Sequence, residues 1–234
     1  MWRTWLKPFL LALIAVGVVF QLWCFAWVGL YRIGLAPYTA FMKSEQMRLL
    51  FEKGRLGLEH EWLDYNEISD NLKRAVVASE DAGFVDHDGV DWNAIEVAKA
   101  RNDKAGKTVA GGSTISMQLT KNLFLSSNKS YLRKAEEIAM TYAMELMLPK
   151  EQILEIYLNS VEWGEGVFGA EAAAQHYFKT SASKLSPQQA AKLAVMLPAP
   201  KKYDANRKSP YLAKRANVVL KRMRAAQIPD DEGV

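Results

Sequence analysis

The sequence predicts a mainly α-helical domain that follows a single N-terminal transmembrane helix. An apolar run extends from Phe9 to Leu30, and Gln21 is its only strongly polar residue. Beyond residue 66, apolar residues recur at spacings of three and four, the pattern of a helix that is buried on one face. Serine and proline residues stand where these helices are expected to begin or end, and no pair of β-strands is predicted.

The apolar run is long enough to cross a bilayer, because about 22 residues at roughly 1.5 Å per residue span a hydrocarbon core of about 30 Å. Trp5 and Trp27 are among the aromatic residues near its two ends, as at membrane interfaces. A cleaved signal peptide is the alternative, but its apolar region would be shorter and followed by small residues. We predict a cytoplasmic tail at residues 1–8, an anchor at residues 9–31 and the rest of the chain outside.

Two segments follow the predicted anchor. Residues 32–66 have mixed polarity and are predicted to form a stalk and entry segment, and residues 67–228 are predicted to form the domain. The helix signals in the domain indicate a helix from Ser130 to Leu148, and further helices that begin at Pro149, Ser186 and Ser209.

Composition excludes several classes of site. The chain of 234 residues has 30 basic and 26 acidic residues, which gives a formal net charge of +4 and suits an anionic partner without identifying it. Its single cysteine excludes an intramolecular disulfide and a cysteine-rich zinc site. The three histidines lie far apart, which excludes a paired-histidine zinc motif.

An acidic segment at residues 79–89, SEDAGFVDHDG, contains four carboxylates, a histidine and a phenylalanine. It could be an acid/base centre, a metal cage or a polar turn without chemistry. The metal cage would use Asp81, Asp86, Asp88 and Asp91, although their spacing matches no EF-hand loop.

A second segment at residues 111–122, GGSTISMQLTKN, has the features of an anion site. Its glycines let backbone amides approach a ligand, and Ser113 is expected to cap the helix that follows. Thr114, Gln118 and Lys121 are spaced to share one face of that helix. A helix N-terminus with a hydroxyl, an amide and an ammonium suits phosphate oxygens. The alternative is a glycine turn before an amphipathic helix.

Arg133 and Glu137 are four residues apart on the predicted helix that begins at Ser130. Taken alone, they would be a surface ion pair that contributes less than about 1 kcal/mol.

Taken together, these segments resemble the motifs of bacterial peptidoglycan glycosyltransferases. Glu80, Asp81, Phe84, His87 and Gly89 match the pattern E-D-x-x-F-x-x-H-x-G. The similarity continues in order through GGSTISMQLTKN, RKAEE (133–137), KEQILEIYLN (150–159), LAVMLPAPKKY and RANVVLKRM, over roughly residues 65–225. The departures are Ser116, Met117 and Ala205, where threonine, glutamine and proline are common in the family.

The resemblance implies a bilobed, lysozyme-like α-helical domain that polymerises lipid II into β-1,4-linked glycan and releases undecaprenyl pyrophosphate. It implies the monofunctional kind of enzyme, without transpeptidase activity, as a single-pass protein of the bacterial inner membrane with its domain on the periplasmic side. The expected partners are lipid II, the growing glycan strand, the membrane and cell-wall synthesis or division proteins, with no nucleic acid. A second membrane contact is expected between Val90 and Val109.

The resemblance also implies roles for individual residues. Glu80 would be the general base, and Glu137 would orient nearby cations or hold a divalent ion such as Mg or Mn; no organic cofactor is expected. The expected substrate-binding residues are Asp81, Phe84, His87, Ser113, Thr114, Gln118, Lys121, Asn122 and Arg133. The rival functions are a lytic glycosidase, which needs neither a phosphate site nor an anchor, and a non-catalytic membrane scaffold.

Overall fold

The computed structural model describes residues 2–33, 38–125 and 130–229 and divides into two compact units, Met1–Pro37 and Tyr38–Val234. The first unit contains α1 (Trp2–Arg32), of which Lys7–Arg32 has a mean hydropathy of 2.4 and is long and apolar enough to cross a membrane. The predicted N-terminal apolar helix is therefore confirmed, and it fits a membrane anchor.

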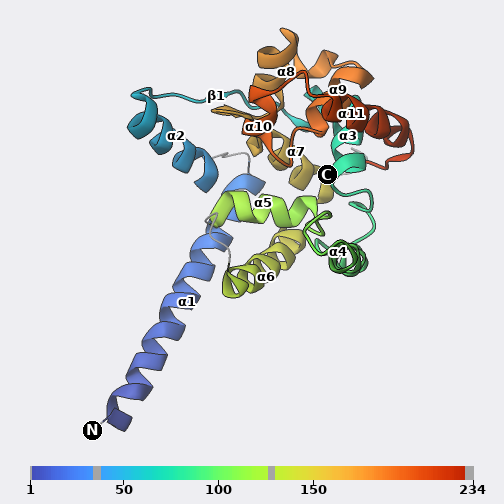
Figure 1. Ribbon diagram of the computed structural model, residues 1–234. Coiled ribbons are helices and arrows are strands. Elements are labelled where there is room, and N and C mark those ends of the chain that lie inside the picture. Colours follow the sequence, from blue (N-terminus) through green and yellow to red (C-terminus); the bar gives the residue numbers. More distant parts are fainter. Residues whose placement is uncertain (1, 34–37, 126–129, 230–234) are drawn as a thin grey trace. The chain divides into compact units, whose positions relative to one another are not determined.

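The second unit is built mainly from helices, which confirms the predicted fold class (Figure 1). The α-helices are α2 (Ala40–Lys53), α3 (Asp70–Glu80), α4 (Trp92–Ala105), α5 (Ile115–Phe124), α6 (Tyr131–Met147), α7 (Lys150–Ser160), α8 (Ala170–Phe178), α9 (Pro187–Ala194), α10 (Pro200–Ala205) and α11 (Pro210–Arg222). Three short 3₁₀ turns are η1 (Tyr65–Glu67), η2 (Ala182–Lys184) and η3 (Met223–Ala225).

The predicted helix boundaries follow from side-chain caps. The Ser130 side chain accepts a hydrogen bond from the Arg133 amide and begins α6. Ser186 and Gln189 form a reciprocal capping box at the start of α9. Pro149 lies one residue earlier than expected, as the N-cap of α7 rather than its first residue. In each case the chain begins a helix where a side chain or a proline accounts for backbone amides that lack a partner within the helix.

A small sheet contradicts the expectation that the chain contains no strand pair. It consists of β1 (Glu59–His60), β2 (Glu162–Gly164) and β3 (Val167–Phe168), in the order β1-β3-β2. β3 pairs with β2 in the antiparallel direction and with β1 in the parallel direction. Strands of two or three residues are too short to show an alternating pattern, so the sequence carries no periodic signal for them.

From Tyr38 onward, the segment that was expected to be a stalk and entry segment packs within the second unit. α2 packs against α5, and β1 pairs with β3 more than 100 residues later in the chain. Met42 and Leu49 of α2 are buried. This burial of apolar side chains differs from a stalk at residues 32–66 and is the physical reason to place the start of the domain near Tyr38.

The helices around the candidate site form two groups. α3 packs against α9 and α11, and α5 packs against α6 and α7 (Figure 1). The two groups meet where the C-terminal end of α3 faces α5, because the Gln118 side chain of α5 donates a hydrogen bond to Glu80 of α3. The acidic segment and the glycine-containing segment of the sequence are therefore neighbours in space.

Candidate active site

The loop after α3 is attached to the start of α5 by the side chains of the acidic segment. Asp81 accepts hydrogen bonds from the Ile115 amide and from Nε2 of His87, both at 3.0 Å. Nδ1 of the same histidine accepts from the Gly89 amide at 3.1 Å. Phe84 is fully buried beneath the loop. Asp81, Phe84 and His87 thus shape the loop that follows Glu80.

Gly89 is required by the close approach of this loop to α6. Its φ of +86° lies in the left-handed region, and a Cβ there would come within 2.7 Å of both Thr141 and Glu145. Its carbonyl accepts a hydrogen bond from the Thr114 hydroxyl. The loop is therefore fixed against both α5 and α6.

Glu80 lies at the end of α3 among uncharged hydrogen-bond donors. Nε2 of Gln118 donates to Oε2 of Glu80 at 3.0 Å, and the Ser79 hydroxyl donates to Oε1 at 3.4 Å. Burial raises the pKa of Glu80, and these two hydrogen bonds offset part of that rise. A raised pKa makes a carboxylate a stronger base, which suits Glu80 to accept a proton.

A polar cavity of about 330 Å³ lies beside this carboxylate. Its lining residues are Phe41, Ser113, Gln118, Lys121, Arg133, Lys134 and Glu137. Glu137 is only 2% exposed, and its two oxygens accept hydrogen bonds from Nη1 of Arg133 at 2.6 Å and from Nζ of Lys134 at 2.5 Å. The pair of Arg133 and Glu137 is therefore not a simple surface ion pair, because its carboxylate is buried while Arg133 and Lys134 stay partly exposed.

The cavity holds more positive than negative charge. Lys121, Arg133 and Lys134 contribute three cations, and Glu137 contributes one carboxylate. Burial lowers the pKa of Lys121; the charge of Glu137 opposes that shift, and the charges of the two other cations add to it. An anion in this cavity would relieve the repulsion among the cations, as a phosphate group does in many proteins.

The structure brings together some of the predicted site residues and separates others. Ser113, Gln118, Lys121, Arg133 and Glu137 line one cavity, and Gln118 connects it to Glu80.

Thr114 and Asn122 are not among the lining residues of this cavity. The expectation that Ser113 caps the helix and that Thr114 lies on its polar face was wrong. The Thr114 side chain is the cap and accepts from the Met117 amide, because α5 begins at Ile115. Asn122 is buried.

Three residues at the site were not predicted. Lys134 stands in the RKAEE segment three residues before Glu137, a spacing that could have indicated its ion pair. Tyr157 lies in the KEQILEIYLN segment, and its hydroxyl donates to Oε1 of Gln118 at 3.0 Å. Phe41 belongs to α2, which was assigned to the stalk, so no signal within the expected domain pointed to it.

The metal-cage interpretation of the acidic segment does not fit the structure. Within residues 2–33, 38–125 and 130–229 there is no group of three or more His, Cys, Asp or Glu side chains placed to hold a metal ion. Asp81 is bonded to His87, and Asp91 caps α4 by accepting from the Ala94 amide at 2.8 Å. Both oxygens of Glu137 already face cations, so a divalent ion does not fit that arrangement either.

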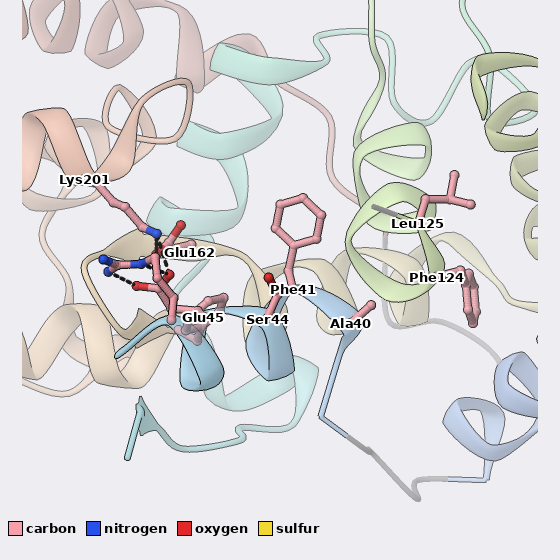
Figure 2. A pocket seen from close by; sticks show the side chains of 10 residues that line it. Ala40, Phe41, Ser44, Glu45, Phe124, Leu125, Glu162 and Lys201 are labelled. Carbon is pink, nitrogen blue, oxygen red and sulfur yellow. Dashed lines mark hydrogen bonds and ion pairs between the residues drawn. The ribbon is translucent and has the colours of Figure 1, made fainter. Parts of the chain in front are cut away.

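A second cavity of about 520 Å³, lined by both apolar and charged side chains, adjoins the first. Phe41 lines both cavities. Figure 2 shows Glu45, Glu162 and Lys201 converging in it from α2, β2 and α10. Nζ of Lys201 lies 2.5 Å from Glu45 and 3.4 Å from Glu162. Burial raises the pKa of Glu162 to about 7, which shows how strongly this cavity disfavours an incompletely paired carboxylate.

Comparisons with known proteins agree with this geometry. Residues 49–224 match the family described as Transglycosylase. A biosynthetic peptidoglycan transglycosylase of Janthinobacterium sp. (strain Marseille) is 51% identical over 229 residues, which cover 96% of this chain and 99% of that protein. A protein of the same name from Paraburkholderia xenovorans (strain LB400) is 53% identical, in an alignment that covers 90% of this chain and 88% of that protein. Another, from Bordetella pertussis (strain Tohama I), is 47% identical, in an alignment that covers 97% of this chain and 96% of that protein. The chain belongs to the transglycosylase family of glycosyltransferase enzymes.

Proposed function

We propose that this enzyme polymerises lipid II into β-1,4-linked glycan, with Glu80 as the general base and the cavity around Lys121, Arg133 and Lys134 as the pyrophosphate site. The observation that carries the proposal is the position of Gln118. Its side chain donates to Glu80 and also lines the cation cavity, so a proton acceptor and an anion site lie on either side of one residue.

The two environments match the two ends of the reaction. The acceptor's 4-hydroxyl oxygen forms a bond to the sugar carbon that carries pyrophosphate, and its proton passes to Glu80. The bond between that carbon and the pyrophosphate oxygen breaks with inversion, and the electron pair leaves with the pyrophosphate. Negative charge that grows on the leaving oxygen is stabilised by preorganised cations in the cavity. Proton acceptance and charge stabilisation are thus assigned to separate groups.

Glu137 acts on the leaving group indirectly in this proposal. Its two hydrogen bonds fix Arg133 and Lys134 on one helix turn and reduce the repulsion between them. Since both oxygens are occupied by these cations, no reaction step is assigned to a metal ion.

We propose that the enzyme works at the outer face of the cytoplasmic membrane, where a lipid-linked substrate is held in two dimensions. The α1 helix supplies the anchor, with its N-terminus in the cytoplasm. Trp92, Val97 and Val109 are each at least half exposed in or beside α4, and they support a second membrane contact there. A reporter joined after Val234 is expected to respond on the extracytoplasmic side, and a cytoplasmic signal would overturn this orientation.

One assay separates the proposed activity from its rivals. The detergent-solubilised protein is incubated in parallel with labelled lipid II and with preformed glycan strands. Formation of polymer from lipid II supports the proposal, whereas fragments released from preformed glycan would indicate a lytic glycosidase. If both substrates stay intact over a range of detergents, the protein acts as a scaffold.

A further inference from the structure

We propose that Tyr157 is a positioning residue, which acts on Glu80 through Gln118. Its hydroxyl holds the oxygen of the Gln118 amide, so that the amino group of the same amide faces the carboxylate of Glu80. The inference rests on the proposed role of Glu80 as the general base. It adds a residue that touches neither substrate nor the reacting atoms.

The three side chains form a chain of hydrogen bonds across three helices. The Tyr157 hydroxyl of α7 donates to Oε1 of Gln118 in α5 at 3.0 Å. Nε2 of Gln118 donates to Oε2 of Glu80 in α3, also at 3.0 Å. Tyr157 is 0% exposed, so it cannot reach a substrate in the cavity, whereas Gln118 is partly exposed there.

The chemistry of an amide gives this arrangement a direction. An amide has an acceptor at one end and a donor at the other, and only its amino group can bond to a carboxylate that lacks a proton. A hydroxyl that donates to the amide oxygen therefore selects the orientation in which the amino group points at Glu80. Hydrogen bonds in such a chain also polarise one another, which strengthens the contact to the carboxylate.

Tyr157 keeps its proton at neutral pH. Burial raises the pKa of Tyr157 well above its usual value, and the nearby charges of Glu80 and Asp81 raise it further. The hydroxyl is thus a permanent donor within the fold. This property suits a fixed support and makes the residue unsuitable as an acid or base in turnover.

The consequence for Glu80 has a predictable sign. Besides Gln118, the groups that act on Glu80 are Ser79 and Asp81 beside it, Lys121 from α5 and Arg215 from α11. The hydrogen bond from Gln118 lowers the pKa of Glu80 against the effect of burial. Loosening Gln118 therefore raises the pKa of Glu80 further, and the acidic limb of the activity profile moves to higher pH.

The test is the substitution Tyr157→Phe in the full-length enzyme, which removes the hydroxyl and keeps the ring. We expect kcat to fall about fivefold with little change in KM, because one hydrogen bond contributes about 1 kcal/mol. We also expect the acidic limb of the pH profile of kcat/KM to move to higher pH. Tyr65→Phe is the matched control, because its buried hydroxyl donates to the Pro229 carbonyl at 2.8 Å, away from the site. Tyr65→Phe should leave both kcat and the acidic limb of the pH profile unchanged.

A double-mutant cycle asks whether Tyr157 acts through Gln118. In a Gln118→Ala background, the further change Tyr157→Phe should cost almost nothing, since the group that it positions is gone. The inference would be overturned if the two substitutions reduced kcat independently, so that their losses multiplied in the double variant. It would also be overturned if the acidic limb of the pH profile of kcat/KM did not shift in Tyr157→Phe alone. The base assignment fails separately, if Glu80→Gln still forms polymer. The inference alone fails if Glu80→Gln is inactive and Tyr157→Phe behaves like Tyr65→Phe.

Discussion

Glu80 and Glu137 are neighbouring carboxylates of one site, and their surroundings differ in charge. Glu80 accepts hydrogen bonds from an amide and a hydroxyl, which are neutral. Glu137 accepts from a guanidinium and an ammonium, and it is nearly inaccessible to solvent. The first environment raises the pKa of its carboxyl group through burial. The second holds two cations in fixed positions.

The difference shows how two identical side chains can have separate functions. A group that must accept a proton needs an environment that leaves its protonated form accessible near neutral pH. A group that organises cations needs firm charge-assisted hydrogen bonds and no change in charge during turnover. The comparison therefore predicts that removing either negative charge damages catalysis, but in different ways.

The largest effect is expected from Glu80→Gln. The amide is nearly isosteric but cannot accept the acceptor's proton, so we expect polymerisation to fall by about a thousandfold or more. Affinity for a phosphoglycolipid inhibitor of the donor site should stay close to that of the unchanged enzyme, and the melting temperature should not fall, because burial already disfavours the charged form of Glu80. The exposed Glu61 offers a control, because Glu61→Gln should leave turnover unaltered. Substantial polymer formation by Glu80→Gln would end the assignment of the base.

A smaller loss, of about a hundredfold, is expected from Glu137→Gln. The amide oxygen can still accept one hydrogen bond, but Lys121, Arg133 and Lys134 lose the carboxylate that lines the cavity with them. Breaking a buried ion pair on one side also destabilises a fold, so the melting temperature should fall here, unlike in Glu80→Gln. The neighbouring substitution Glu136→Gln on α6 is the control. If melting and turnover of Glu137→Gln match those of the control, Glu137 does not organise the site.

Lys121→Met should reduce lipid II use by about 10- to 100-fold, because it removes one charge-assisted contact to a dianionic group. Far-UV circular dichroism should remain native-like, since burial already lowers the pKa of Lys121 and its charge is not needed by the core. The substitution Lys192→Met, at an exposed position of α9, serves as the comparison. Near-normal activity of Lys121→Met would place the pyrophosphate elsewhere.

Local signals in the sequence predicted most of the fold. The apolar run, the caps at Ser130 and Ser186, and the helical spacing are properties of neighbouring residues, and the structure confirms these features. The strands β1 and β3 could not be predicted in the same way. Their pairing joins Glu59 to Val167, and such a contact between short, distant segments leaves no periodic trace.

The candidate site was predictable to the extent that its parts share a helix. Arg133 and Glu137 lie on one turn of α6, so their contact followed from spacing alone. The bond from Gln118 to Glu80 links α5 to α3, and Tyr157 adds α7; only packing of the helices reveals these contacts. Single-residue shifts matter as well, since Thr114 is a buried cap because α5 begins one residue after it.

The smallest predicted effect concerns Glu162, a third carboxylate, which is partly buried and shares the ammonium of Lys201 with Glu45. Nζ of Lys201 is 3.4 Å from Glu162 and 2.5 Å from Glu45, so the closer pair takes most of the attraction (Figure 2). Burial raises the pKa of Glu162 from 4.5 to about 7. The folded state therefore favours the protonated group, and its contribution to stability is complete below about pH 4.5 and is lost as the pH rises through 7.

The substitution Glu162→Gln should remove the loss of stability that occurs as the pH rises through 7. At pH 8 the variant is expected to be more stable than the unchanged enzyme, by at most about 3 kcal/mol, and the difference should disappear near pH 4.5. Thermal melting of the full-length protein in detergent at the two pH values measures it, with the exposed substitution Glu61→Gln as the control. A difference that does not depend on pH would contradict the raised pKa. A pH-dependent gain would show that the shared ammonium of Lys201 does not keep Glu162 charged in this cavity, in contrast to Glu137, each of whose oxygens accepts a hydrogen bond from a cation.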